Sequence, residues 1–274
     1  MSDIDRLVEF VRQRKNITVL SGAGCSTGSG IPDYRDEDGN WKNAQPVQFG
    51  DFVKSPAVRK RYWARSFAGW RRISKARPNA AHAALAKLEQ SGHVQSLITQ
   101  NVDSLHRMAG SRMVIDLHGV LHETRCLHCD TEGKRSDWQA ILEENNPGWT
   151  PQVAAYTPDG DAELSDSDYL EFNVPDCPVC GGIIKPDVVF FGESVPAKKV
   201  NAATERLERS DALLVVGSSL MVFSGYRFAH LANAAKIPVV IINRGRTRAD
   251  DIAVHKLSSD CAEVLPRLVD GLAA

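Results

Sequence analysis

Four of the six cysteines in the chain form two pairs with the spacing of a metal site. Cys126 and Cys129 are separated by two residues, and the same spacing separates Cys177 from Cys180. Two such turns direct four thiolates at one ion and complete a tetrahedral Cys₄ zinc site. The alternatives are two disulfides or four unrelated buried cysteines, but the tight Cys-Pro-Val-Cys-Gly-Gly turn at the second pair favours zinc. A closed shell of four thiolates has no open position for a substrate, so we expect this zinc to be structural.

A glycine-rich segment near the N-terminus has the composition of a phosphate-binding loop. The apolar run at residues 17–20 leads into residues 22–24, and glycines after a first strand let the backbone approach a pyrophosphate. The usual dinucleotide fingerprint is incomplete, because Thr27 stands where its third glycine is expected. Residues 33–35 then supply a carboxylate, an aromatic ring and a guanidinium. This set suits a nucleotide better than a plain turn.

Short apolar runs alternate with helical patterns along the chain. The length and β-branched content of the runs are typical of strands buried on both faces of a parallel sheet. These runs are residues 17–20, 94–98, 114–117, 188–191, 212–216 and 238–242. The helical patterns are residues 80–90, 197–209 and 225–235. The alternation predicts an open, doubly wound α/β sheet of the Rossmann type.

Polar clusters follow most of the predicted strands. They are residues 99–106, 118–119, 217–219 and 243–245. Ligands bind outside the carboxyl ends of the strands in such sheets, so we expect these clusters to line one crevice. Of the eight histidines, His118 stands out because it directly follows an apolar strand and precedes Gly119. An imidazole with its ordinary pKa of about 6.5 suits a general base at neutral pH.

Two insertions interrupt the alternation. Residues 43–78 are aromatic and basic and predict a small helical insertion, whereas residues 121–185 carry the cysteine pairs. The segment between the pairs is longer than in the usual zinc ribbon, and its acidic part, residues 159–176, is expected to be a solvated loop. The predicted domains are therefore a Rossmann-like domain and a small domain. The first comprises residues 1–42, 79–120 and 186–274, and the second comprises residues 43–78 and 121–185.

Composition excludes some classes of function. The 274 residues carry a net charge of -1, which gives no electrostatic support for a nucleic-acid partner. No apolar run approaches the ~20 residues that cross a bilayer, so we expect no membrane partner. The N-terminus lacks the features of a signal peptide, and thiols kept for a metal suit a reducing compartment. We therefore expect a cytoplasmic protein.

Several motifs occur together and in one order. They are GAGCSTGSGIPDYR, TQNVDSLH, LHG, the two CxxC pairs, KPDVVFFGE, VGSS and INRG. In this combination the chain resembles the sirtuins, which are NAD-dependent protein-lysine deacylases, over nearly its whole length. VGSSLMVFSGYRF and RYWARSFAGW resemble the class II branch that includes the mitochondrial type-4 sirtuins and many bacterial enzymes. The family fold is a large Rossmann-type domain with a small domain made of a zinc ribbon and a helical insertion, as predicted above.

The resemblance implies a role for each matching residue. His118 would be the base that takes a proton from the ribose hydroxyls, and Asn101 and Asp103 would hold the nicotinamide amide and a nearby water. The implied NAD-binding residues are Gly22, Ala23, Gly24, Ser26, Asp33, Tyr34, Arg35, Gln100, Asn101, Val102, Asp103, Gly217, Ser218, Ser219, Asn243, Arg244, Gly245 and Cys261. The implied peptide-binding residues are Val189, Phe190, Phe191 and Gly192, which would pair with the acylated lysine segment of a protein substrate as an added strand.

Some alternatives remain open at this point. Mono-ADP-ribosyl transfer to protein would use the same cofactor and first bond-breaking step, and a zinc-ribbon adaptor is a third possibility. Tyr62 and Arg65 have a spacing that another sirtuin branch uses to bind succinyl groups, although an amphipathic helix with a solvated basic face is the favoured interpretation. Cys25 is either a packed thiol or a redox-sensitive one. We expect weak activity on acetyl-lysine and better activity on a longer or carboxylated acyl-lysine.

Overall fold

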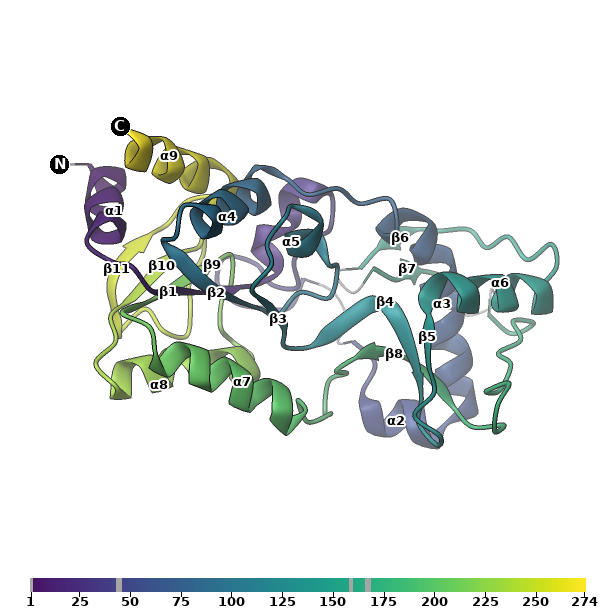
Figure 1. The fold of residues 1–274 in the computed structure, drawn as a ribbon. Helices are drawn as coiled ribbons and strands as arrows, with labels where there is room; N and C mark the ends of the chain where they lie inside the picture. The colour runs from purple at the N-terminus through teal and green to yellow at the C-terminus, as the bar shows by residue number, and fades with distance from the viewer. Residues whose placement is uncertain (1, 43–45, 158–159, 166–168) are drawn as a thin grey trace.

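The computed structural model describes residues 2–42, 46–157, 160–165 and 169–274. Its centre is a six-stranded, wholly parallel sheet with the order β11-β10-β9-β1-β2-β3 (Figure 1). The strands are β1 (Ile17–Ser21), β2 (Val94–Thr99), β3 (Val114–Asp116), β9 (Ala212–Val216), β10 (Val239–Ile242) and β11 (Ala253–Leu257). The strand order reverses beside β1, and a sheet of this kind binds its ligand at such a switch point. The predicted fold class is confirmed.

Helices cover both faces of this sheet. The elements α1 (Asp3–Arg12), α4 (Ala80–Gln90) and α9 (Cys261–Ala273) lie on one face, and α7 (Ala197–Glu208) and α8 (Phe223–Ala234) lie on the other (Figure 1). Side chains alternate along the strands, so Val19 packs with Leu85 of α4, whereas Leu20 packs with Phe228 of α8. Each fully buried side chain of this size stabilises the fold by about 1.5–3 kcal/mol.

A second body is built from the two insertions. Its antiparallel sheet has the order β5-β4-β8. The strands are β4 (Gly119–Cys126), β5 (Glu132–Lys134) and β8 (Ile184–Val188), with a small hairpin of β6 (Ala155–Tyr156) and β7 (Ala162–Glu163). The helices are α2 (Phe49–Lys54), α3 (Pro56–Ile73) and α6 (Arg135–Asn145). Short helical segments η1 (Ala23–Cys25), η2 (Thr27–Ser29) and α5 (Leu105–Met108) follow strands of the main sheet.

The predicted strand at residues 188–191 is wrong. The strand found there, β8, ends at Val188 and pairs antiparallel with β4 in the second sheet. Phe190 packs against Phe52 and Tyr62 of the helical insertion, with ring centroids 5.1 and 5.0 Å away. The apolar side chains of this run therefore fill the core of the small body, which an apolar pattern alone cannot distinguish from the main core.

The segment between the cysteine pairs is also more ordered than predicted. Within its described part, Asp161, Ala162 and Phe172 are buried, although a solvated loop was expected. Gly69 of α3 allows this packing, since an added Cβ would lie 2.8 Å from the Cα of Asp161. Residues 158–159 and 166–168 of the predicted loop lie outside the described residues. In the described part of the chain, no helix combines the length and apolar character of a membrane span.

Candidate active site

A cavity of about 1060 Å³ lies at the carboxyl ends of the central strands. Every residue that the sequence assigned to catalysis, to NAD or to the peptide contributes to its lining. The resemblance therefore selected residues that the fold brings together from segments far apart in sequence. The four paired cysteines are absent from this lining, as expected for a structural metal site.

Glycines let two loops meet at the floor of the cavity. The Gly24 N–H donates to the Gly217 carbonyl at 2.8 Å. A Cβ on Gly22 would lie 2.7 Å from the Cβ of Ser218, and one on Gly24 would lie 2.9 Å from the Gly217 oxygen. Gly217 also has a positive φ of +59°, which favours glycine. The two loops therefore pack closely at the cavity floor, and no side chain of Gly22, Gly24 or Gly217 covers the backbone there. An exposed glycine backbone at this place suits a pyrophosphate, so the residues present fit NAD.

A buried polar network follows β2. Asn101 Nδ2 donates to the Gly22 carbonyl at 3.0 Å and to Ser26 Oγ at 3.1 Å. Ser26 Oγ in turn donates to Asp103 Oδ2 at 2.6 Å, and Asp103 Oδ1 accepts from the Leu105 N–H at 2.9 Å. Asn101, Ser26 and Asp103 are all buried. Their side chains are therefore held in one orientation at the cavity wall.

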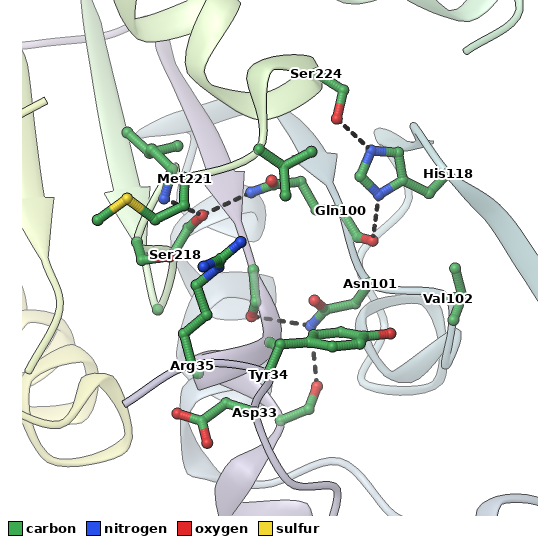
Figure 2. A pocket seen from close by; sticks show the side chains of 18 of the residues that line it. Asp33, Tyr34, Arg35, Gln100, Asn101, Val102, His118, Ser218, Met221 and Ser224 are labelled. Atoms are coloured by element: carbon green, nitrogen blue, oxygen red, sulfur yellow. Dashed lines mark hydrogen bonds between the residues drawn. The ribbon is translucent and has the colours of Figure 1, made fainter. Parts of the chain in front are cut away.

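The tautomer of His118 follows from its two hydrogen bonds. Nδ1 lies 2.9 Å from the Gln100 carbonyl oxygen, which can only accept, so Nδ1 carries the proton. Nε2 is then the basic nitrogen, and it accepts from Ser224 Oγ at 2.8 Å (Figure 2). Burial, the largest cause, and the positive charges of Lys199 and Arg227 together lower the pKa of His118 to about 4, although the hydrogen bond to Gln100 raises it. The ordinary pKa expected from the sequence is therefore wrong, and the imidazole is neutral at physiological pH.

An aromatic cluster joins the loop after β1 to the segment that follows β8. Tyr34 and Trp41 contact Phe191 edge-on, with centroid distances of 6.2 and 5.5 Å. Arg35 lies 4.0 Å above the Trp41 ring and donates to the Gly39 carbonyl at 2.7 Å. Tyr34, Arg35 and Phe191 were predicted from the sequence, whereas Trp41 was not. Its position six residues after Arg35 in a loop gave no periodic signal.

The helical insertion contributes Tyr62, but not Arg65, to the cavity. Tyr62 is buried and lines the wall, whereas Arg65 donates through Nε to the Ala162 carbonyl at 3.0 Å. The side chain of Arg65 thus joins α3 to the β6–β7 hairpin. This geometry supports the amphipathic-helix interpretation over a carboxylate-binding pair.

Cys25 is packed beneath the loop. It is 1% exposed, and a hydrogen bond with Cys261, together with burial, raises the pKa of its thiol well above the usual value. A redox-sensitive thiol requires accessible thiolate, which both effects oppose. The structure therefore favours the packing role.

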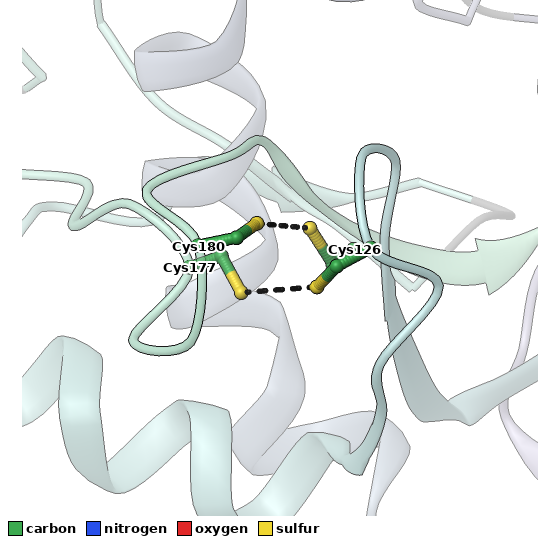
Figure 3. Close-up of side chains that lie close together, drawn as sticks. Cys126, Cys177 and Cys180 are labelled. Carbon is green, nitrogen blue, oxygen red and sulfur yellow. Dashed lines mark hydrogen bonds between the residues drawn. The ribbon is translucent and has the colours of Figure 1, made fainter.

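The four paired cysteines converge where β4 ends and shortly before β8 begins (Figure 3). Their sulfur atoms all lie within 4.8 Å of one another, and none of the four is in a disulfide. Cys126 Sγ lies 3.5 Å from Cys180 Sγ, and Cys129 Sγ lies 3.9 Å from Cys177 Sγ. Tetrahedral zinc with bonds of about 2.3 Å requires sulfur–sulfur distances of about 3.8 Å. The donor set and its spacing therefore fit one structural zinc ion.

A cavity of this volume at the switch point of a parallel sheet is typical of enzymes that bind a dinucleotide. The Sir2 family model matches residues 22–224. The chain is 55% identical over 269 residues to an NAD-dependent protein deacetylase of Bordetella bronchiseptica, covering 98% of each chain. It is 48% identical to the NAD-dependent protein deacylase Sirt4 of Drosophila melanogaster, covering 98% of this chain and 87% of the relative.

Solved structures agree with the family model. The structure described as "Sir2 bound to acetylated peptide" superposes with a TM-score of 0.79 at 31% identity, covering 99% of this chain and 100% of the other. That described as "Sir2-p53 peptide-NAD+" superposes with a TM-score of 0.78 at 31% identity and covers 98% of each chain. The chain belongs to the Sir2 family, as its motifs predicted.

Proposed function

We propose that this chain is an NAD-dependent protein deacylase whose chemistry takes place in the cavity of about 1060 Å³. The observation that carries the proposal is the convergence of the catalytic, NAD-binding and peptide-binding residues on that one cavity. The family and the curated relatives support NAD as cofactor and acyl-lysine protein as substrate. They give no support to mono-ADP-ribosyl transfer as the main activity.

The loops at the carboxyl ends of the strands would divide the dinucleotide between them. Residues 22–26 would hold the phosphates, and residues 217–219, residues 243–245 and the backbone of Cys261 would hold the adenosine half. Residues 33–35 would form the loop over the reactive ribose, with Tyr34 excluding water. Bound NAD would supply a glycosidic bond to a positively charged nicotinamide ring, which leaves as neutral nicotinamide. Asn101 and Asp103, fixed by Ser26, would bind the nicotinamide amide and an adjacent water.

His118 would act as the base. Its Nδ1–H is engaged by the Gln100 carbonyl, so Nε2 is the nitrogen that can accept a proton. The Ser224 hydroxyl occupies Nε2. A ribose hydroxyl could therefore give its proton to Nε2 only if the Ser224 hydroxyl moved away, or if it donated its own proton to Nε2 and accepted the ribose proton in exchange. Burial keeps the imidazole neutral and therefore ready to accept that proton.

The peptide would lie along residues 189–192. Several backbone groups there already have partners, because the Val189 N–H donates to the His118 carbonyl at 2.7 Å and the Phe191 carbonyl accepts from the Phe49 N–H at 2.8 Å. The Phe190 N–H donates to Glu193 Oε2 at 2.8 Å. The added strand would therefore use the remaining groups of this segment, which restricts its register.

The zinc ion would stabilise the small body, and the small body would in turn support the active site. We assign residues 43–78 and 121–185 to the small body, and we assign residues 1–42, 79–120 and 186–274 to the Rossmann-like domain. The four thiolates must stay reduced to hold the metal, so we place the protein in the cytoplasm. We propose no nucleic-acid role, since the net charge is -1.

An acyl-lysine peptide panel with NAD tests the function. We expect acyl-ADP-ribose and free nicotinamide from the wild type and at least a 100-fold loss of turnover in His118→Tyr, which removes the base. Radiolabelled NAD separates the alternative activity, because label on protein would indicate ADP-ribosyl transfer. Transfer of label without any deacylated peptide would contradict the proposal.

A further inference from the structure

Arg227 lines the cavity without an anionic partner. It lies on α8, one turn after Ser224, the residue that touches the proposed base. Its Nε is shielded from solvent and has no hydrogen-bond partner, and no ion pair involves Arg227 within the described ranges of the chain. A half-buried cation without a counter-ion is unfavourable, which points to an anion supplied from outside the chain.

Most carboxylates that line the cavity have other partners. Glu193, on the peptide side, pairs with Lys185 at 3.1 Å. On the cofactor side, Asp33 pairs with Lys42, and Asp260 pairs with Arg244. Asp103 accepts from Ser26 and Leu105. None of these contacts involves Arg227, so its guanidinium has no carboxylate partner among these residues.

Phe223 lies beside Arg227, and Lys199 acts on His118 as Arg227 does. Phe223, at the start of α8, lies 5.2 Å from the guanidinium carbon of Arg227, and 56% of its surface is exposed although it lines the cavity. Lys199 of α7 is half-buried and close enough to His118 to act on it electrostatically, as Arg227 does. The cation and the exposed aromatic ring line the same cavity as the proposed peptide segment, and together they form a surface that an acidic peptide would cover.

We propose that Arg227, assisted by Phe223 and Lys199, binds the carboxylate of an aspartate or glutamate within two positions of the acyl-lysine in the protein substrate. The guanidinium offers paired N–H donors that match a carboxylate, and the half-buried setting strengthens the ion pair relative to one in bulk water. The inference rests on the proposed function, because it places the peptide at residues 189–192. It adds a substrate class, namely lysines in acidic surroundings.

A matched peptide series tests this inference on the full-length enzyme. Three acetyl-lysine peptides carry glutamate, glutamine or lysine at the flanking positions, and a fourth carries glutaryl-lysine with glutamine flanks. We expect kcat/KM about tenfold higher with glutamate than with glutamine flanks, mainly through KM, and a smaller preference at high salt. In Arg227→Gln this preference should disappear.

Two further variants sharpen the result. Arg248→Gln is the control, because Arg248 also lies over a ring of α8, 4.2 Å from Tyr226, but is absent from the cavity lining. It should retain the preference for acidic flanks, whereas Arg227→Glu should prefer lysine flanks. Equal kcat/KM for the three acetyl peptides in the wild type would overturn the inference. A loss of kcat/KM in Arg227→Gln that is confined to the glutaryl-lysine peptide, or that is equal on all four peptides, would also overturn it. Absence of NAD-dependent turnover on every peptide would instead contradict the proposed function.

Discussion

The basic nitrogen of His118, Nε2, accepts a hydrogen bond from Ser224 Oγ at 2.8 Å. Ser224 lies in the first turn of α8, whereas His118 follows β3. The start of this helix therefore holds the imidazole in place (Figure 2). Together with the Gln100 carbonyl on Nδ1, this contact fixes the imidazole from both sides. The two bonds define the ring orientation and its tautomer before any ligand is bound.

Replacing Ser224 with alanine should lower kcat about three- to tenfold. The imidazole would keep its hydrogen bond to Gln100 but lose the one from Ser224 Oγ to Nε2, a change worth roughly 0.5–1.5 kcal/mol. The Kd for NAD should change little, because Ser224 lies outside the proposed phosphate and adenosine contacts. Ser224→Thr keeps a hydroxyl and should retain most of the activity. An unchanged kcat in Ser224→Ala would contradict the role.

The pH dependence of kcat/KM should reflect the pKa of His118, which burial lowers to about 4. The base works when neutral, so its contribution stays constant from alkaline pH down to mildly acidic pH and falls as pH approaches 4. In the unfolded chain the same group binds a proton at about pH 6.5, so the free energy of unfolding decreases as pH falls from about 6.5 toward 4. Initial rates from pH 5 to 9, with folding checked by tryptophan fluorescence, would test this. An inflection of kcat/KM near pH 6.5 that arises from a group of the enzyme, and not from the substrate, would contradict it.

Removing the metal should destabilise the small body. Cys177→Ser leaves three thiolates, and metal affinity in such a ribbon contributes directly to folding. We expect one zinc ion per wild-type chain by elemental analysis, and a melting temperature about 10 °C lower or more in the variant. Cys25→Ala, which lies outside the four-cysteine cluster, should retain its zinc. Equal zinc content in Cys177→Ser and wild type would count against the site.

Longer apolar acyl chains should be better substrates than acetyl or carboxylated ones. Tyr62, Ile73 and Leu121 are buried at the cavity wall, and Arg65 bonds a backbone carbonyl elsewhere. Ile73→Phe should reduce kcat/KM for butyryl-lysine several-fold and spare acetyl-lysine, because overfilling the wall removes space for the chain end. Val53→Phe, on the exposed face of α2, is the size-matched control. A wild-type optimum on acetyl-lysine across the panel would refute this expectation.

Local patterns predicted the main sheet well. The runs that became β1, β9 and β10 are largely apolar because their strands are buried on both faces, and β2 is buried at every residue except Gln95. The helix α4 begins after a capping asparagine, Asn79, and ends before Gly92. The edge strand β11 has a half-exposed, polar pattern, so it carries no such signal and was missed. The helices α1 and α9 were also not predicted, although capping residues, Ser2 and Asp260, precede them and both are amphipathic.

The chemistry was specified by short motifs. Residue types at the strand ends, and the resemblance that they carry, were enough to name His118, the glycine loops and the paired cysteines. These motifs are local in sequence because each places a few backbone or side-chain groups within one turn. Their convergence on one cavity could be expected from the rule for parallel sheets, which depends only on strand direction.

Only the tertiary structure decided the protonation, orientation and neighbours of these groups. The pKa of His118 depends on burial and on Lys199 and Arg227, which lie more than 80 residues away in sequence. The hydroxyl of Ser224 and the ring of Trp41 reach the site through packing that no local pattern encodes. Sequence by itself therefore determined which groups are present and at which strand end. Desolvation and long-range contacts, which arise only when the chain is folded, determined their protonation, orientation and neighbours.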